Sequence, residues 1–90
     1  MAFTDADVAN FRAAAATQGA ADDLYRLGLI YSIGQGAPVD LVQAHMWFNL
    51  AALRGLPAAR EQRKELADQM TETQVAAALK AAREWMGRRQ

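Results

Sequence analysis

The sequence predicts an all-α domain of about five short antiparallel helices. Of the 90 residues, 21 are Ala, against four Val, two Ile and two Pro, and this balance favours helices over strands. Apolar residues recur at helical spacing along almost the whole chain. Glycines and capping residues interrupt that spacing at a few clear points.

We expect two helices in the first part of the chain. The first begins at Thr4, which Asp7 complements three residues later as an amino-terminal cap, and it ends at Gly19. The second begins near Ala20 and stops at the turn 34–36, where two glycines can adopt positive φ. Their predicted apolar stripes are Val8, Phe11 and Ala15, then Leu24, Leu27, Gly28 and Tyr31.

Three more helices are predicted to follow, each with a recognisable start. Asp40 caps the third, with Gln43 in the reciprocal position of a capping box, and Gly55 closes it. Pro57 suits the first turn of the fourth, and a capping box at 71–74 opens the last. Their predicted core residues are Ala44, Trp47, Phe48, Ala51, Ala52, Ala59, Leu66, Ala67, Met70, Val75, Ala78, Leu79, Ala82, Trp85 and Met86.

Composition excludes several classes of function. A chain of 90 residues is one small domain. The absence of Cys excludes disulfides, thiolate zinc sites and a thiol nucleophile, and the net charge of zero argues against a general nucleic-acid binder. His45 is the only histidine, and its helical neighbours Leu41 and Asn49 offer no carboxylate, so we interpret it as a surface residue. We therefore expect no enzyme, no metal and no cofactor.

The location of the protein is also suggested by the sequence. The first seven residues lack the basic and apolar regions of a secretory signal, and no stretch approaches ~18 apolar residues. We expect a cytoplasmic protein with no membrane partner. Residues 1–45 carry a net charge of −3 and residues 46–90 carry +3, a polarity that could orient the molecule on a partner.

A repeat with a period of thirty-six residues runs through the first half. Residues 51–55 echo residues 15–19, and Trp47 falls on Phe11. A period of 30 to 40 residues built from helix pairs is typical of an α-solenoid. One full unit lies between the two glycines, with these landmarks: Ala20, Ala21, Leu27, Gly28, Tyr31, Gly34, Gly36, Asp40, Ala44, Trp47, Phe48, Ala51, Ala52 and Gly55.

Residues 20–55 resemble a complete Sel-one-like repeat (SLR), a relative of the tetratricopeptide repeat. The resemblance implies that 1–90 is a single short solenoid: 1–19 a degenerate half repeat, 56–70 a partial repeat and 71–90 a carboxyl-terminal capping helix. The sequence Ala37-Pro38-Val39 departs mildly from the usual loop. Only one complete repeat is present, whereas solenoids usually need about three.

The resemblance also implies a function, because SLR proteins act as adaptors or scaffolds for other proteins. Many are bacterial, and the Ala- and Arg-rich composition is similar. We expect a partner protein or peptide to bind through residues of the second helix that the repeat core does not need: Asp22, Tyr25, Arg26, Leu29 and Ser32. The alternative is a self-associating homodimer, in which two short solenoids complete each other's core.

Overall fold

The computed structural model describes residues 3–88, and within this range it consists of five helices without a strand. Their bounds are α1 Asp5–Thr17, α2 Ala21–Ile33, α3 Leu41–Leu53, α4 Pro57–Ala67 and α5 Glu72–Arg88. The all-α prediction is confirmed. Residues 1–2 and 89–90, at the ends of the first and last predicted segments, lie outside the described residues.

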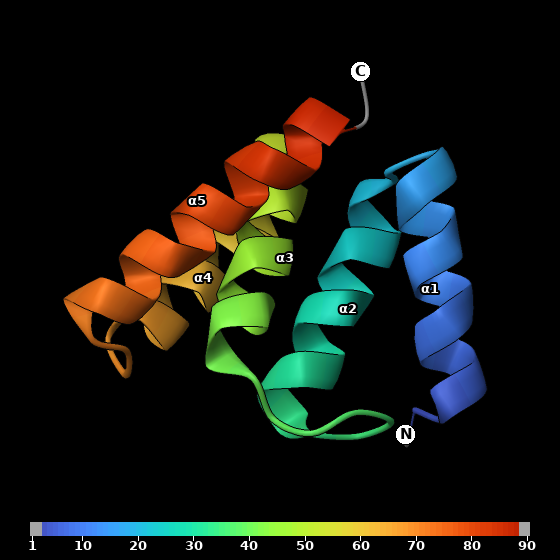
Figure 1. Cartoon of the computed structure of the whole chain (residues 1–90), viewed down its shortest axis with the longest axis horizontal. Helices are drawn as coiled ribbons and strands as arrows, with labels where there is room; N and C mark the ends of the chain where they lie inside the picture. The colour runs from blue at the N-terminus through green and yellow to red at the C-terminus, as the bar shows by residue number, and fades with distance from the viewer. Residues whose placement is uncertain (1–2, 89–90) are drawn as a thin grey trace.

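Helix α3 lies at the centre of the fold. It packs against α2 on one side and against α4 and α5 on the other, whereas α1 packs against α2. Figure 1 shows α1, α2 and α3 side by side, running in alternating directions. Every residue from Ala44 to Ala51 is buried, because neighbouring helices cover α3 on several sides.

The predicted helix ends are largely confirmed. The Thr4–Asp7 pair is a complete capping box, and so is the Thr71–Gln74 pair. Gly34 ends α2 in the left-handed region with φ +82°. The capping box predicted for Gln43 is wrong in one half: its backbone N–H donates to the Asp40 carboxylate, but its side chain accepts a hydrogen bond from elsewhere.

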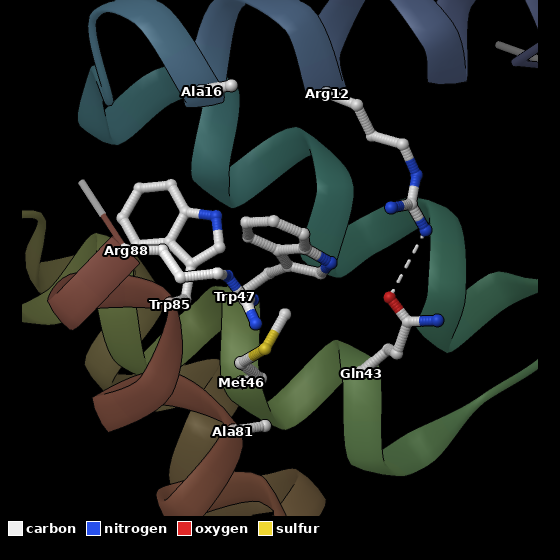
Figure 2. Close-up of a pocket in the computed structure, with 8 residues that line it drawn as sticks. All are labelled: Arg12, Ala16, Gln43, Met46, Trp47, Ala81, Trp85 and Arg88. Carbon is white, nitrogen blue, oxygen red and sulfur yellow. Dashed lines mark hydrogen bonds between the residues drawn. The ribbon is translucent and has the colours of Figure 1, made fainter.

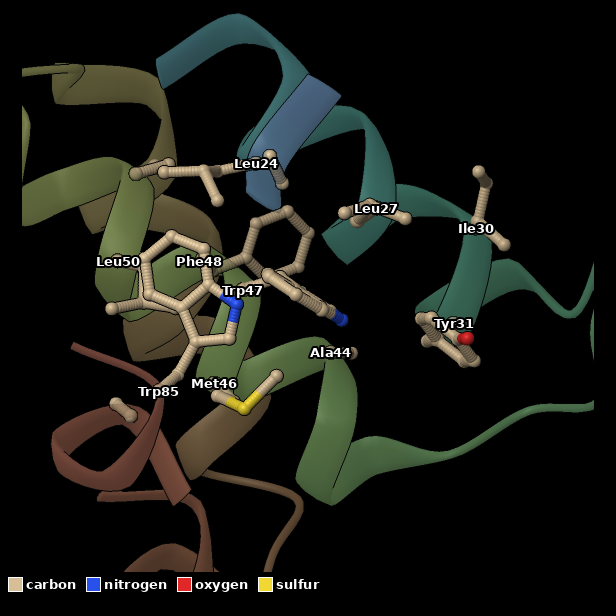
Figure 3. Close-up of a cluster of buried hydrophobic side chains, with 14 of the residues drawn as sticks. Leu24, Leu27, Ile30, Tyr31, Ala44, Met46, Trp47, Phe48, Leu50 and Trp85 are labelled. Atoms are coloured by element: carbon tan, nitrogen blue, oxygen red, sulfur yellow. The ribbon is translucent and has the colours of Figure 1, made fainter. Parts of the chain in front are cut away.

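The predicted apolar stripes of α2 and α3 form the centre of the core. The largest fully buried side chains are Phe48, Leu24, Leu27, Ile30 and Leu50; Figure 3 shows how these aliphatic and aromatic groups meet. A Cβ atom at Gly28 would lie 2.5 Å from the Phe48 ring, so only glycine allows α2 and α3 this close approach.

The prediction that His45 lies on the surface is wrong. Its side chain is only 3% exposed, because it lies on a part of α3 that other helices cover. A signal for this burial exists in the sequence: residues 41–53 contain no Asp, Glu, Lys or Arg. A helix without charged residues is typical of one that is surrounded by protein.

The predicted core stripe of α5 is correct only in part. Ala78, Ala82 and Trp85 are buried, but Leu79 and Met86 are exposed. The reason is that α5 lies at the edge of the fold and turns one narrow face toward α3. Along residues 3–88, no helix combines the length and the apolar character that crossing a bilayer requires.

Candidate functional site

A hollow of about 460 Å³ lies between three helices that are distant in the sequence. Figure 2 shows its lining, in which α1 contributes one wall, α5 the opposite wall and α3 the floor between them. The lining residues are Arg12 and Ala16 of α1, Gln43, Met46 and Trp47 of α3, and Ala81, Trp85 and Arg88 of α5. Its volume falls within the roughly 300 to 1,000 Å³ that is typical of ligand sites.

Two indole rings form the apolar part of this pocket. Trp47 and Trp85 meet edge to face, with ring centroids 5.8 Å apart and planes at 80°, an arrangement that aromatic pairs prefer. Both rings are buried, at 3% and 9% exposure. Trp47 therefore joins the α2–α3 core to α5 and at the same time faces the pocket.

The Trp47 indole nitrogen is a buried donor that has no hydrogen-bond partner among the described residues. In Figure 2 this nitrogen is directed toward the side of the pocket where Arg12 and Gln43 meet. Figure 3 agrees, since there it lies on the side of Ala44 and Tyr31. Buried N–H groups usually have a hydrogen-bond partner, so this donor is an exception within the described residues.

Within the described part of the chain, Arg12 is held by a hydroxyl and an amide and not by a carboxylate. Its Nη2 donates to the Tyr31 hydroxyl and to Gln43 Oε1, the latter at 3.3 Å, and its guanidinium lies 5.3 Å from the Tyr31 ring centroid. These contacts join α1, α2 and α3. They orient the cation without neutralising it.

Arg88 supplies a second cation from the last turn of α5. A basic residue at this end of a helix is favoured by the helix dipole. Within residues 3–88, neither Arg12 nor Arg88 forms an ion pair with a carboxylate. No acidic side chain is among the described residues that line the pocket, so its electrostatic character is positive.

A second polar cluster lies between α3 and α4. Arg63 Nη1 donates to Asn49 Oδ1 at 2.6 Å, and His45 Nδ1 has no hydrogen-bond partner among the described residues. Burial, and secondly the charge of Arg63, lower the pKa of His45 below its ordinary value of 6.5. The histidine is therefore neutral at pH 7, and this cluster contributes polar groups to the α3–α4 interface.

Among the described residues, no group of three or more His, Cys, Asp or Glu is placed to hold a metal ion. The pocket instead combines aromatic surface with two cations. These groups can bind an apolar group that carries negative charge.

The five binding residues predicted on α2 lie on one face of that helix, and none of them lines the pocket. Asp22 and Arg26 are exposed; Arg26 forms an ion pair with Asp23 at 3.4 Å and lies 5.5 Å from the Phe11 ring centroid. The structure thus brings these residues together on one face of α2, away from the pocket.

The other three predicted residues are half-buried and have structural contacts. The Tyr25 ring packs 5.5 Å from that of Phe48, Leu29 packs against the core, and the Ser32 hydroxyl donates to the Leu29 carbonyl. Their role in binding stays a prediction.

The pocket was not predicted from the sequence, because α1, α3 and α5 meet only through tertiary packing. Arg12 and Gln43, 31 positions apart, gave no local sign of their contact.

A scan against protein-family models, a search of curated proteins and a search of solved structures found no match to this chain. The resemblance to SLR proteins therefore stays a prediction.

Proposed function

We propose that the chain is a protein-interaction module, an adaptor or scaffold that binds a segment of a partner protein in the pocket between α1, α3 and α5. The observation that carries the proposal is a hollow with two indole rings and two cations, neither of which forms an ion pair within residues 3–88. Aromatic and arginine side chains are the usual anchors of protein interfaces.

The resemblance to SLR proteins supports the same function, and we propose membership of that family with it. The two repeat-closing glycines, Gly19 and Gly55, both have positive φ, at 64° and 92°. The equivalent Ala15 and Ala51 are both completely buried. Corresponding positions of the predicted repeat thus have corresponding local structure, as units of a solenoid would.

Site-specific photo-crosslinking tests the proposal. A small aliphatic diazirine residue (photo-leucine), which is less bulky than phenylalanine, replaces the alanine at position 16, in the pocket, and is compared with the same residue at position 58, an exposed alanine of α4. We expect a cross-linked partner protein from position 16 only. The adduct should disappear when Ala81→Phe fills the pocket, while far-ultraviolet circular dichroism stays unchanged.

The alternative of self-association predicts a different product from the same experiment. The opposite charges of the two halves of the chain, −3 and +3, favour docking between copies. A cross-linked dimer of this chain, with an apparent mass of two copies by light scattering, would replace the adaptor proposal. No adduct from position 16 in the cells that make the protein would contradict binding through the pocket.

A further inference from the structure

The two cations of the pocket lie on opposite sides of its aromatic floor. Figure 2 shows Arg12 reaching in from α1 and Arg88 from the end of α5, with Trp47 between them. A single carboxylate at one end of a ligand would satisfy one of these groups. A ligand with negative charge on both sides of an apolar group would satisfy both.

Arg12 has donors left for such a ligand. A guanidinium has five N–H groups, and the hydrogen bonds of Arg12 to Tyr31 and Gln43 use Nη2 alone. The N–H groups on Nη1 and Nε have no partner among the described residues. Because Tyr31 and Gln43 already hold the side chain in place, a ligand would immobilise little more of it on binding.

The space over the indoles suits one apolar side chain. Ala16 and Ala81 are the smallest side chains on the two walls, and Met46 adds a flexible apolar surface on α3. The Trp47 N–H is covered by protein, so a ligand in the hollow would contact the aromatic rings and not this donor.

From this arrangement we propose that the pocket recognises an extended acidic–apolar–acidic segment of a partner protein. The apolar side chain packs on Trp47 and Trp85, and the flanking carboxylates bind Arg12 and Arg88. This inference rests on the proposed function and specifies the chemistry of the bound segment.

Capped tripeptides test the inference by nuclear magnetic resonance. The chain has two Trp, so the spectrum of the ¹⁵N-labelled protein has two indole N–H signals, and Trp85→Phe assigns the one of Trp47. The probes are acetyl-Glu-Leu-Glu-amide, its neutral analogue acetyl-Gln-Leu-Gln-amide and acetyl-Glu-Ser-Glu-amide. A fourth probe, acetyl-Gln-Gln-Leu with a free carboxylate, presents its charge at the chain end.

We expect acetyl-Glu-Leu-Glu-amide to shift the Trp47 indole signal and to bind at least tenfold more tightly than each of the other three probes. Arg88→Gln should weaken its binding about tenfold. Arg83→Gln is the matched control, because Arg83 is an exposed residue of α5 that does not line the pocket, and it should leave binding unchanged.

Three results would overturn the inference: equal binding of the neutral analogue, tighter binding of the free-carboxylate probe, or no shift of the Trp47 signal. The same two experiments distinguish a failure of the proposed function from a failure of this inference. If acetyl-Glu-Leu-Glu-amide binds selectively but position 16 cross-links no protein, the adaptor function is wrong and the chemistry of the pocket stands. If position 16 cross-links a partner but the probes do not discriminate, only the inference is wrong.

Discussion

Helices α1 and α3 share several residues at positions thirty-six apart, yet equivalent residues are buried to different depths. Ala15 and Ala51 are both completely buried. Phe11 is half-buried, however, while its counterpart Trp47 is only 3% exposed. The difference comes from their neighbours, since α1 packs mainly on α2, whereas α3 packs on α2, α4 and α5. A repeated pattern therefore fixes which residues face inward, and the neighbouring helices fix how deeply they are buried.

The largest expected effect compares the two aromatic positions directly. Trp47→Ala should lower the free energy of unfolding by about 3 to 5 kcal/mol, because it removes a fully packed ring that joins α3 to α5. Phe11→Ala should cost roughly 1 to 2 kcal/mol, since less of its surface is buried. Urea denaturation of both variants measures the difference. Equal losses would contradict the view that the number of neighbouring helices sets the depth of burial.

The second prediction concerns α2, which has α1 on one side and α3 on the other. Gly28→Ala should destabilise the protein by about 1 to 3 kcal/mol, because the new Cβ would lie 2.5 Å from the Phe48 ring. Gly87→Ala is the control, because a Cβ there meets nothing within 4 Å. That change should be neutral or stabilising by up to about 1 kcal/mol. If both variants melt at the same temperature, the α2–α3 contact is less tight than described.

A third prediction uses the buried histidine, whose counterpart on α1, Ala9, is exposed. Well above pH 6.5, His45 is mostly neutral in both the folded and the unfolded chain. Below this pH the unfolded chain takes up a proton that the folded chain does not, because the pKa of His45 is lowered in the fold. Stability should therefore fall on acidification by up to about 1.4 kcal/mol per pH unit, until the folded-state pKa is reached.

The variant His45→Gln isolates this contribution from that of the carboxylates. Its free energy of unfolding, measured at pH 7.5, 6.0 and 5.0, should decline less steeply than that of the parent chain. Identical pH dependence in the two proteins would show that His45 takes up its proton as readily in the fold as in the unfolded chain.

The smallest effect is expected where α3 is as exposed as α1. Leu53 is 60% exposed, and Thr17 stands at the equivalent position of α1. Leu53→Thr should change the free energy of unfolding by less than about 0.5 kcal/mol. A loss well above this value would mean that Leu53 is covered in solution, for example by a second copy of the chain.

Much of the fold was predictable because its signals are local. The capping boxes at Thr4 and Thr71, the proline that opens α4 and the positive-φ glycines each act within a few residues of the chain. The burial of His45 and the exposure of Leu79 were predicted incorrectly. Both depend on which helices pack together, and the spacing of apolar residues within one helix does not determine that packing.

The candidate site was less predictable than the helices. Trp47 was predicted as a core residue, and it is buried against Trp85. The convergence of Arg12, Trp47 and Arg88 depends on the angles between α1, α3 and α5, which no spacing within one helix determines. The predicted face of α2 came from the resemblance to SLR proteins and from the residues that the repeat core does not need, and neither shows whether a face is hollow.

The turn between α2 and α3 has a consequence for the order of folding. Its Gly36 lies so near the start of α1 that a Cβ there would be 2.9 Å from the Thr4 carbonyl oxygen, and Figure 1 shows this loop reaching toward the amino-terminal end of α1. That contact joins residues some thirty positions apart, so it forms only when α1 has packed on α2 and the turn after α2 is in place. We expect α1 to dock late and its amide protons to exchange with solvent faster than those of α3.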